Sequence, residues 1–129
     1  MKRMNVNSVR TCHYPDSPDW YELCDTYGIL LVCECDIETH GVMGALTHDP
    51  AWAAAFVDRA QRMARCYKNH VSIYSWSLGN ESGTGPNHAA MYGFLKEYDP
   101  TRLCQYEAGE PGKNISDIRG NMYATVDNI

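Results

Sequence analysis

The chain has 129 residues, the size of one ordinary domain, and its 44% hydrophobic and 21% charged residues are typical of a globular protein. A formal net charge of −5 and the lack of a Lys/Arg cluster argue against nucleic acid or an acidic membrane surface as a partner. No apolar run approaches the ~20 residues that cross a bilayer, and the first residues have no signal-peptide core, so we expect no membrane association.

Strand-like and helix-like patterns alternate along the chain. The first five residues resemble the last turn of a helix, and Pro18, Pro50 and Asn87 each stand at the start of a helical pattern. The expected strands, which are apolar and bounded by turn residues, cover residues 6–11, 29–35, 103–106 and 118–123, with a central one that begins at Val71.

This alternation predicts parallel βα units and therefore an α/β fold. About five parallel strands are too few to close an eight-stranded barrel. The chain also opens in a helix tail and stops just after a strand. We therefore expect an incomplete TIM (β/α)8 barrel fragment, in which residues 1–129 lack the first and last barrel units. An open, doubly wound five-stranded sheet is the alternative.

Six cysteines show neither a CxxC pair nor zinc-ribbon spacing. Most lie in expected strands or helices, where a free Cys behaves as a small buried hydrophobe. We expect them to be reduced, which favours a cytoplasmic location, with the periplasm as the alternative. The six are Cys12, Cys24, Cys33, Cys35, Cys66 and Cys104.

Residues 71–85, VSIYSWSLGNESGTG, change character halfway. The first half is rich in β-branched and aromatic residues, as in a buried strand, and the second half has three glycines, as in a tight loop. Asn80 and Glu81 lie at the boundary. Catalytic acids of α/β barrels often occupy that position. A solvated loop Glu beside a turn-forming Asn is the simpler alternative.

Glu38 and His40 follow the end of an expected strand and are two residues apart. In an extended chain their side chains point to the same side. A carboxylate and an imidazole suit Mg²⁺ or Mn²⁺ better than a thiolate-rich zinc site does. A simple Glu–His hydrogen bond at a loop mouth is the alternative.

His13 follows another strand, and Tyr123 lies at the end of the last expected one. Each alone is explained as an ordinary loop histidine or a core tyrosine. All these polar residues, however, fall at or just past the carboxyl ends of expected strands. In a parallel βα fold those ends share one face, where ligands bind.

Four segments, in this order and spacing, resemble the family 2 glycoside hydrolases over nearly the whole chain. They are VRTCHYP at residues 9–15, LCDTYG at 23–28, DIETHG at 36–41 and WSLGNESG at 76–83. The Glu-x-His pair resembles the β-galactosidase branch, because the β-glucuronidases of the same family lack it. The resemblance implies a retaining β-galactosidase with a (β/α)8 barrel and a β-galactoside substrate such as lactose.

The resemblance also implies residue roles. Glu81 matches the general acid/base, and Asn80 matches the residue that hydrogen-bonds the sugar 2-hydroxyl. His13 matches a histidine that contacts the galactosyl hydroxyls in the transition state, and Tyr123 matches the tyrosine that touches the nucleophile; both are expected to bind substrate. The set of Mg²⁺ ligands implied by the resemblance is Glu38, His40 and Glu81.

The nucleophilic carboxylate that retention requires lies on a later strand in the family, so we expect the isolated chain to be inactive. Three alternatives stay open: a non-catalytic sugar-binding fragment, an assembly fragment, and a β-glucuronidase-like hydrolase. Association through exposed barrel edges or through a longer protein would give a homo-oligomer.

Overall fold

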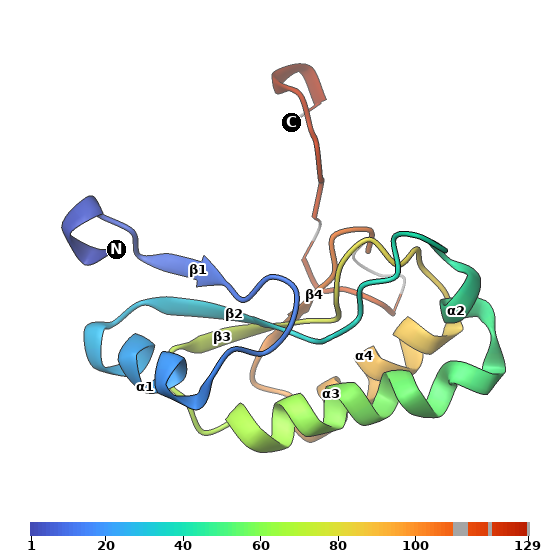
Figure 1. Cartoon of the computed structure of the whole chain (residues 1–129), viewed down its shortest axis with the longest axis horizontal. Coiled ribbons are helices and arrows are strands. Elements are labelled where there is room, and N and C mark those ends of the chain that lie inside the picture. Colours follow the sequence, from blue (N-terminus) through green and yellow to red (C-terminus); the bar gives the residue numbers. More distant parts are fainter. Residues whose placement is uncertain (110–113, 119, 129) are drawn as a thin grey trace.

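The computed structural model describes residues 1–109, 114–118 and 120–128. Its centre is a four-stranded parallel sheet in the spatial order β1-β2-β3-β4, which is also the order along the chain (Figure 1). The strands are β1 (Ser8–Arg10), β2 (Leu30–Glu34), β3 (Ile73–Ser77) and β4 (Leu103–Gln105). This arrangement confirms the expected α/β barrel fragment built from parallel units.

Helices connect successive strands and cover one face of the sheet (Figure 1). The long ones are α1 (Pro18–Tyr27), α3 (Ala53–Tyr67) and α4 (Pro86–Tyr98). The short α2 (Ala45–His48) lies in the loop after β2, where we expected no helix. Three 3-10 turns complete the list: η1 (Lys2–Met4), η2 (Pro50–Trp52) and η3 (Val126–Asn128).

The main core lies between the sheet and these helices. Leu31 and Cys33 of β2 and Trp76 of β3 are fully buried, beside Phe56 of α3 and Leu95 of α4. Burying one such apolar side chain stabilises the fold by about 1.5–3 kcal/mol. The sheet's other face exposes Leu30, Tyr74 and Leu103 by 40–51%. The open face is therefore the one that a complete barrel would turn inward.

Two helical segments begin at the expected prolines, although Pro50 opens the 3-10 turn η2 and the α-helix α3 itself begins only at Ala53. Pro18 is the first residue of α1, and Gly28 ends it in the left-handed region with a φ of 62°. Asp49 caps the turn at Pro50 by accepting a hydrogen bond from the Ala51 N–H at 2.9 Å. Helix α4 begins at Pro86, one residue earlier than the expected start at Asn87.

The strand expected over residues 118–123 is wrong for most of its length. Ile118 forms an isolated parallel bridge with Gln105, residue 119 lies outside the described residues, and the following described residues form no strand. Side chains replace the ladder, because the Asp117 carboxylate accepts the Cys104 N–H at 2.8 Å. Tyr123 also has a φ of 55°, which is incompatible with a strand.

The six cysteines are free, in agreement with the expected reduced state. Four of them are buried, whereas Cys12 and Cys66 are exposed. Burial raises the pKa of the Cys33 thiol to about 12, so this thiol is inert at neutral pH. Within the part of the chain that the structure describes, no helix has the length and apolarity needed to cross a membrane.

Candidate active site

The loop that follows β3 carries Asn80 and Glu81 and packs against the segment that follows β2. Gly79 has a φ of 132°, and a Cβ on it would lie 2.4 Å from the carbonyl oxygen of Ile37. Only glycine fits there. The close approach lets the Asn80 N–H donate to that same oxygen at 2.8 Å, and Asn80 pairs with Glu38 in an isolated bridge. The two strand ends thereby present their polar side chains together.

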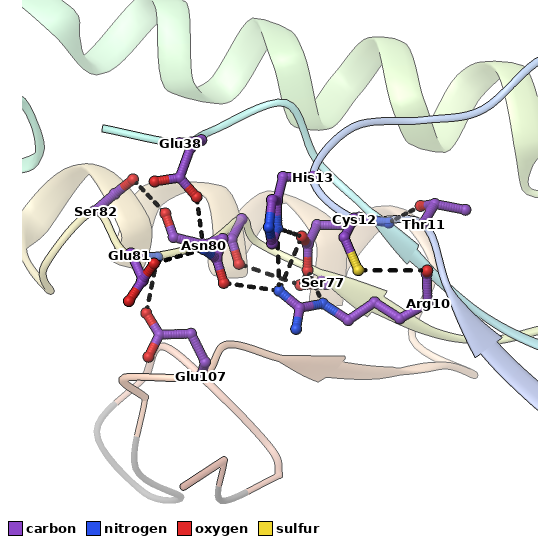
Figure 2. A network of polar contacts seen from close by, with 12 residues as sticks. Arg10, Thr11, Cys12, His13, Glu38, Ser77, Asn80, Glu81, Ser82 and Glu107 are labelled. Atoms are coloured by element: carbon purple, nitrogen blue, oxygen red, sulfur yellow. Dashed lines mark hydrogen bonds and ion pairs between the residues drawn. The ribbon is translucent and has the colours of Figure 1, made fainter. Parts of the chain in front are cut away.

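The Asn80 side chain, at 2% exposure the most buried of the candidate site residues, connects the charged groups around it (Figure 2). Its Oδ1 accepts a hydrogen bond from Arg10 at 2.8 Å. Its Nδ2 donates to Glu38 Oε2 at 2.6 Å and to Glu81 Oε2 at 3.3 Å. Because Arg10 can only donate, the amide must turn its nitrogen toward the two carboxylates.

Glu38, His40 and Glu81 each offer one ligand atom, and these three atoms lie within 4.8 Å of one another. The His40 Nδ1 ring atom is 3.4 Å from Glu81 Oε2, and the backbone N–H of His40 donates to Glu38 Oε1 at 3.2 Å. Two carboxylates this close repel each other unless a cation or a proton lies between them. Their oxygens and the imidazole nitrogen form a donor set that fits Mg²⁺ or Mn²⁺.

Buried hydroxyl groups fix the Glu81 loop from behind. The Ser82 hydroxyl donates to the Asn80 carbonyl at 2.7 Å and accepts the Thr39 N–H at 2.9 Å. The Tyr106 hydroxyl accepts the Ser82 N–H at 3.0 Å and donates to the Gly83 carbonyl at 2.7 Å. Glu81 itself has a φ of 37°, and these contacts, together with the Glu107 contact described next, keep it in that unfavourable conformation.

Glu107 follows β4 and accepts the Glu81 backbone N–H at 2.9 Å (Figure 2). Burial raises the pKa of the Glu107 carboxyl, the hydrogen bond from Glu81 partly offsets this, and the Glu81 charge adds to it. Tyr123 is 81% exposed, and its hydroxyl donates to Glu81 Oε1 at 3.0 Å. That hydrogen bond to a carboxylate raises the pKa of the tyrosine. Tyr123 is therefore a neighbour of Glu81 and not a core residue.

His13 belongs to the same network through different partners. Its Nδ1 lies 2.8 Å from Glu34 Oε1, and Glu34 is fully buried at the end of β2. Arg10 forms an ion pair with Glu34 and also contacts Asn80, so it joins His13 and its partner to the carboxylate cluster. Burial alone would lower the pKa of Arg10, but its hydrogen bond to Glu34 and the Glu34 charge raise it.

Arg10, Glu34 and Glu107 are not among the site residues predicted from the sequence. A signal was present for each, because Arg10 and Glu34 are charged residues that end a strand and Glu107 is a charged residue two positions after β4. The structure brings together all six residues that we did single out: Glu38, His40, Asn80 and Glu81 directly, Tyr123 through Glu81, and His13 through Arg10.

The family model described as "Glycosyl hydrolases family 2, TIM barrel domain" matches residues 1–129. This chain belongs to that family. The β-galactosidase of Alteromonas mediterranea is 54% identical over 129 residues, which cover 98% of this chain and 12% of that protein. The β-galactosidase of Vibrio vulnificus is 51% identical over 131 residues, covering 100% of this chain and 13% of the relative. The chain thus spans about an eighth of the length of the curated relatives it matches.

Solved structures support the fold of this family 2 chain. An FMN-binding β-glucuronidase from Facaelibacterium prausnitzii L2-6 superposes with a TM-score of 0.74 at 24% identity, over 92% of this chain and 20% of that chain. A family 2 β-galacturonidase from Eisenbergiella tayi, bound to galacturonate, gives a TM-score of 0.68 at 30% identity, over 81% and 19%. The aligned part is 12–20% of each of the four proteins named here.

Proposed function

We propose that this chain is the part of a retaining β-galactosidase barrel that carries the general acid/base, Glu81. The observation that supports this most is the placement of the Glu81 carboxylate. It lies 21% exposed at the carboxyl ends of the strands, within reach of Asn80 and His40. Two β-galactosidases that are 51% and 54% identical over nearly the whole chain favour galactosides as the substrate class, lactose among them.

Retaining hydrolysis uses two carboxyl groups about 5–5.5 Å apart. Glu81 would first protonate the leaving glycosidic oxygen and would then remove a proton from the attacking water. Neither Glu34 nor Glu107 suits the role of nucleophile. Glu34 already accepts hydrogen bonds from Arg10 and Ser77, and Glu107 is bound to the Glu81 N–H. Glu110 lies outside the described residues. In line with the family resemblance, which implies a nucleophile on a later strand, we propose that the nucleophile is not in this chain and that the isolated chain is inactive.

Glu38, His40 and Glu81 would hold a Mg²⁺ ion, since their ligand atoms already converge. When bound, the ion supplies positive charge that offsets the repulsion between the two carboxylates. Asn80 would keep its amide near the sugar, because Arg10 and Glu38 fix both ends of that amide. His13 and Tyr123 would bind substrate hydroxyls, as the family resemblance implies.

A chimera tests the activity. The 129 residues replace the aligned ones of the Alteromonas mediterranea β-galactosidase, whose identity over this segment is 54%. We expect the chimera to hydrolyse nitrophenyl β-galactoside to the β-anomer first, as NMR during turnover would show. The isolated chain should give no turnover. A folded chimera that is inactive on galactosides, or one that prefers glucuronides, would refute the proposal.

Calorimetry tests the ion site in the same chimera. Wild-type residues should bind Mg²⁺ or Mn²⁺, and Glu38→Gln together with His40→Ala should abolish that binding. Asp58→Asn is a matched control, because it removes an exposed carboxylate that pairs with Arg62 on the surface of α3. Unchanged binding in the double variant would exclude these residues as ligands.

A further inference from the structure

We propose that the buried Glu34 is a positioning residue that keeps the His13 proton on Nδ1, so that Nε2 meets a ligand as a hydrogen-bond acceptor. The proposal rests on the proposed function only for the identity of that ligand as a galactoside. The tautomer itself follows from contacts within the chain.

Glu34 can only accept hydrogen bonds in this site. Its side chain is fully buried, and both Arg10 Nε and Arg10 Nη2 donate to it, the latter at 3.0 Å. The Ser77 hydroxyl lies 2.7 Å from Glu34 Oε2, and its oxygen accepts a hydrogen bond from Gln105 Nε2 at 3.0 Å. Because the amide occupies an acceptor site of the hydroxyl, the hydroxyl proton points to Glu34. The other acceptor for that proton, the Gly79 carbonyl, is more distant at 3.4 Å. With these donors in place, Glu34 needs no proton of its own.

The contact between Glu34 Oε1 and His13 Nδ1, at 2.8 Å, therefore requires the proton to be on the histidine. A lone pair on Nδ1 would face a carboxylate lone pair at this short distance. It would gain only Arg10 Nη2 as a donor, at 3.4 Å. The shorter contact decides the tautomer, because a charge-assisted hydrogen bond at this length is stronger than a long neutral one.

A neutral histidine protonated on Nδ1 has a lone pair on Nε2. The His13 side chain is 41% exposed while its Glu34 partner is fully buried, so a ligand can reach the ring. A sugar hydroxyl that contacts Nε2 must then be the hydrogen-bond donor, with Nε2 as the acceptor. This predicts a chemical preference: replacing that hydroxyl by fluorine, which cannot donate, should be as harmful as removing it.

The tautomer is measured first, without substrate. Long-range ¹⁵N–¹H spectra of the imidazole rings at pH 8 separate the two neutral tautomers from imidazolium, and His13→Gln assigns the signal among the five histidines. We expect the Nδ1–H form in the wild-type chain. Glu34→Gln should change that pattern, whereas Ser77→Ala, which removes a donor to Glu34 but leaves His13 untouched, should not. A wild-type spectrum with Nε2–H or with imidazolium would overturn the proposal whether or not the variants fold.

Kinetics in the chimera give the second measurement. Monodeoxy and monofluoro nitrophenyl galactosides are compared, and the hydroxyl that meets His13 is the one whose loss stops mattering in His13→Ala. At that position, deoxy and fluoro sugars should both lose about tenfold or more in kcat/KM, to a similar extent. A fluoro sugar that retains activity where the deoxy sugar fails would show that His13 donates. If the chimera turned over no galactoside, the proposed function would fail while the spectrum still decided the tautomer.

Discussion

Networks of charged side chains lie at both ends of the parallel strands. At the amino ends, the Asp99 carboxylate accepts hydrogen bonds from Trp76 Nε1 at 3.0 Å and from the Thr101 hydroxyl at 2.7 Å, and it pairs with Arg102. Arg102 in turn donates to the carbonyls of Ile73 and His70. One negative group and one positive group are matched there, and the positive group is also held by two backbone carbonyls.

At the carboxyl ends the balance is different. The carboxylates of Glu38 and Glu81 both accept a hydrogen bond from Asn80 Nδ2, and Glu107 is a third acid beside them. Arg10 bonds to Glu34 and Asn80 and, among the described residues, forms no ion pair with Glu38, Glu81 or Glu107, although its charge partly offsets the rise in the pKa of Glu107 that burial causes. In barrel enzymes, the carboxyl-end face carries the chemistry and the opposite face carries stability. The difference in charge balance between the two networks agrees with that division.

The largest effect expected from this contrast is on rate. In the chimera, Glu81→Gln should lower kcat/KM for nitrophenyl galactoside about 10²- to 10⁴-fold, because a general acid/base is lost. The melting temperature should stay constant or rise, since the variant removes one of three neighbouring negative charges. Rate assays and thermal unfolding of the same preparation check both parts. Retained activity, or a large loss of stability, would remove the distinction between the two faces.

The second effect is on stability. Asp99→Ala should lower the free energy of unfolding of the chain by about 3–5 kcal/mol, because it leaves Arg102 and the Trp76 N–H without their buried partner. Urea denaturation measures the loss. Asp58→Ala on α3 is the matched control, and its exposed ion pair with Arg62 should contribute less than about 1 kcal/mol. Equal losses in the two variants would contradict the role given to burial.

The sequence was sufficient to predict that Glu38, His40, Asn80 and Glu81 converge, but not that Arg10, Glu34 and Glu107 join them. Glu38 and Asn80 are 42 residues apart, yet each follows a buried strand, and parallel strands end on the same face. The start of α1 at Pro18 and the helical turn at Pro50 could also be predicted, because proline fits a first turn whatever packs against it. The start of α3 at Ala53, three residues later than predicted, could not. These features depend on local chemistry and on the parallel topology alone.

The remaining features depend on register and packing that one sequence does not encode locally. Arg10 meets Glu34 across 24 residues only because Arg10 pairs with Val32 in the ladder between β1 and β2. The pattern at residues 118–123 resembles a strand, but the Asp117 side chain takes up the Cys104 N–H that a ladder would use. Such competition between a side chain and the backbone is decided by tertiary contacts.

The third effect concerns the layer beneath the site. Burial, with a smaller effect from nearby His48, lowers the pKa of His88 to about 4, and its ring stacks on Tyr106 at 4.3 Å. The unfolded chain binds a proton at His88 near pH 6.5, whereas the folded chain does so only near pH 4. The contribution of His88 is therefore complete above pH 6.5 and is lost as the pH falls to 4, at a cost of about 3 kcal/mol.

Unfolding free energies of the chain between pH 7 and 4 measure this loss. His88→Phe keeps a ring against Tyr106 and should flatten the dependence in that interval. If the unfolding free energy of the variant fell as steeply with pH, the acid sensitivity would come from the carboxylates and not from His88.

The smallest expected effect is on stability at the amino ends of the strands, where Asp25 contributes both a negative charge and hydrogen-bond acceptors. Asp25 accepts the Ser72 N–H at 2.8 Å and pairs with His70 Nδ1 at 2.7 Å. Burial would raise the pKa of Asp25, but the hydrogen bonds from Ser72 and His70 outweigh it and lower the pKa. Asp25→Asn keeps an acceptor for Ser72 and loses the negative charge, so it should cost about 1–2 kcal/mol at pH 7.

The sign of the pH dependence follows from the lowered pKa. The contribution of the Asp25 charge is complete above the unfolded pKa of about 3.9 and is lost as the pH falls through the lower folded value. The difference in unfolding free energy between Asp25→Asn and wild type, measured by urea denaturation, should therefore become smaller below pH 4. In the chimera the same variant should leave kcat/KM unchanged, in contrast to Glu81→Gln. A difference that persisted at low pH would mean that shape and hydrogen bonding at this end, and not charge, produce the stability.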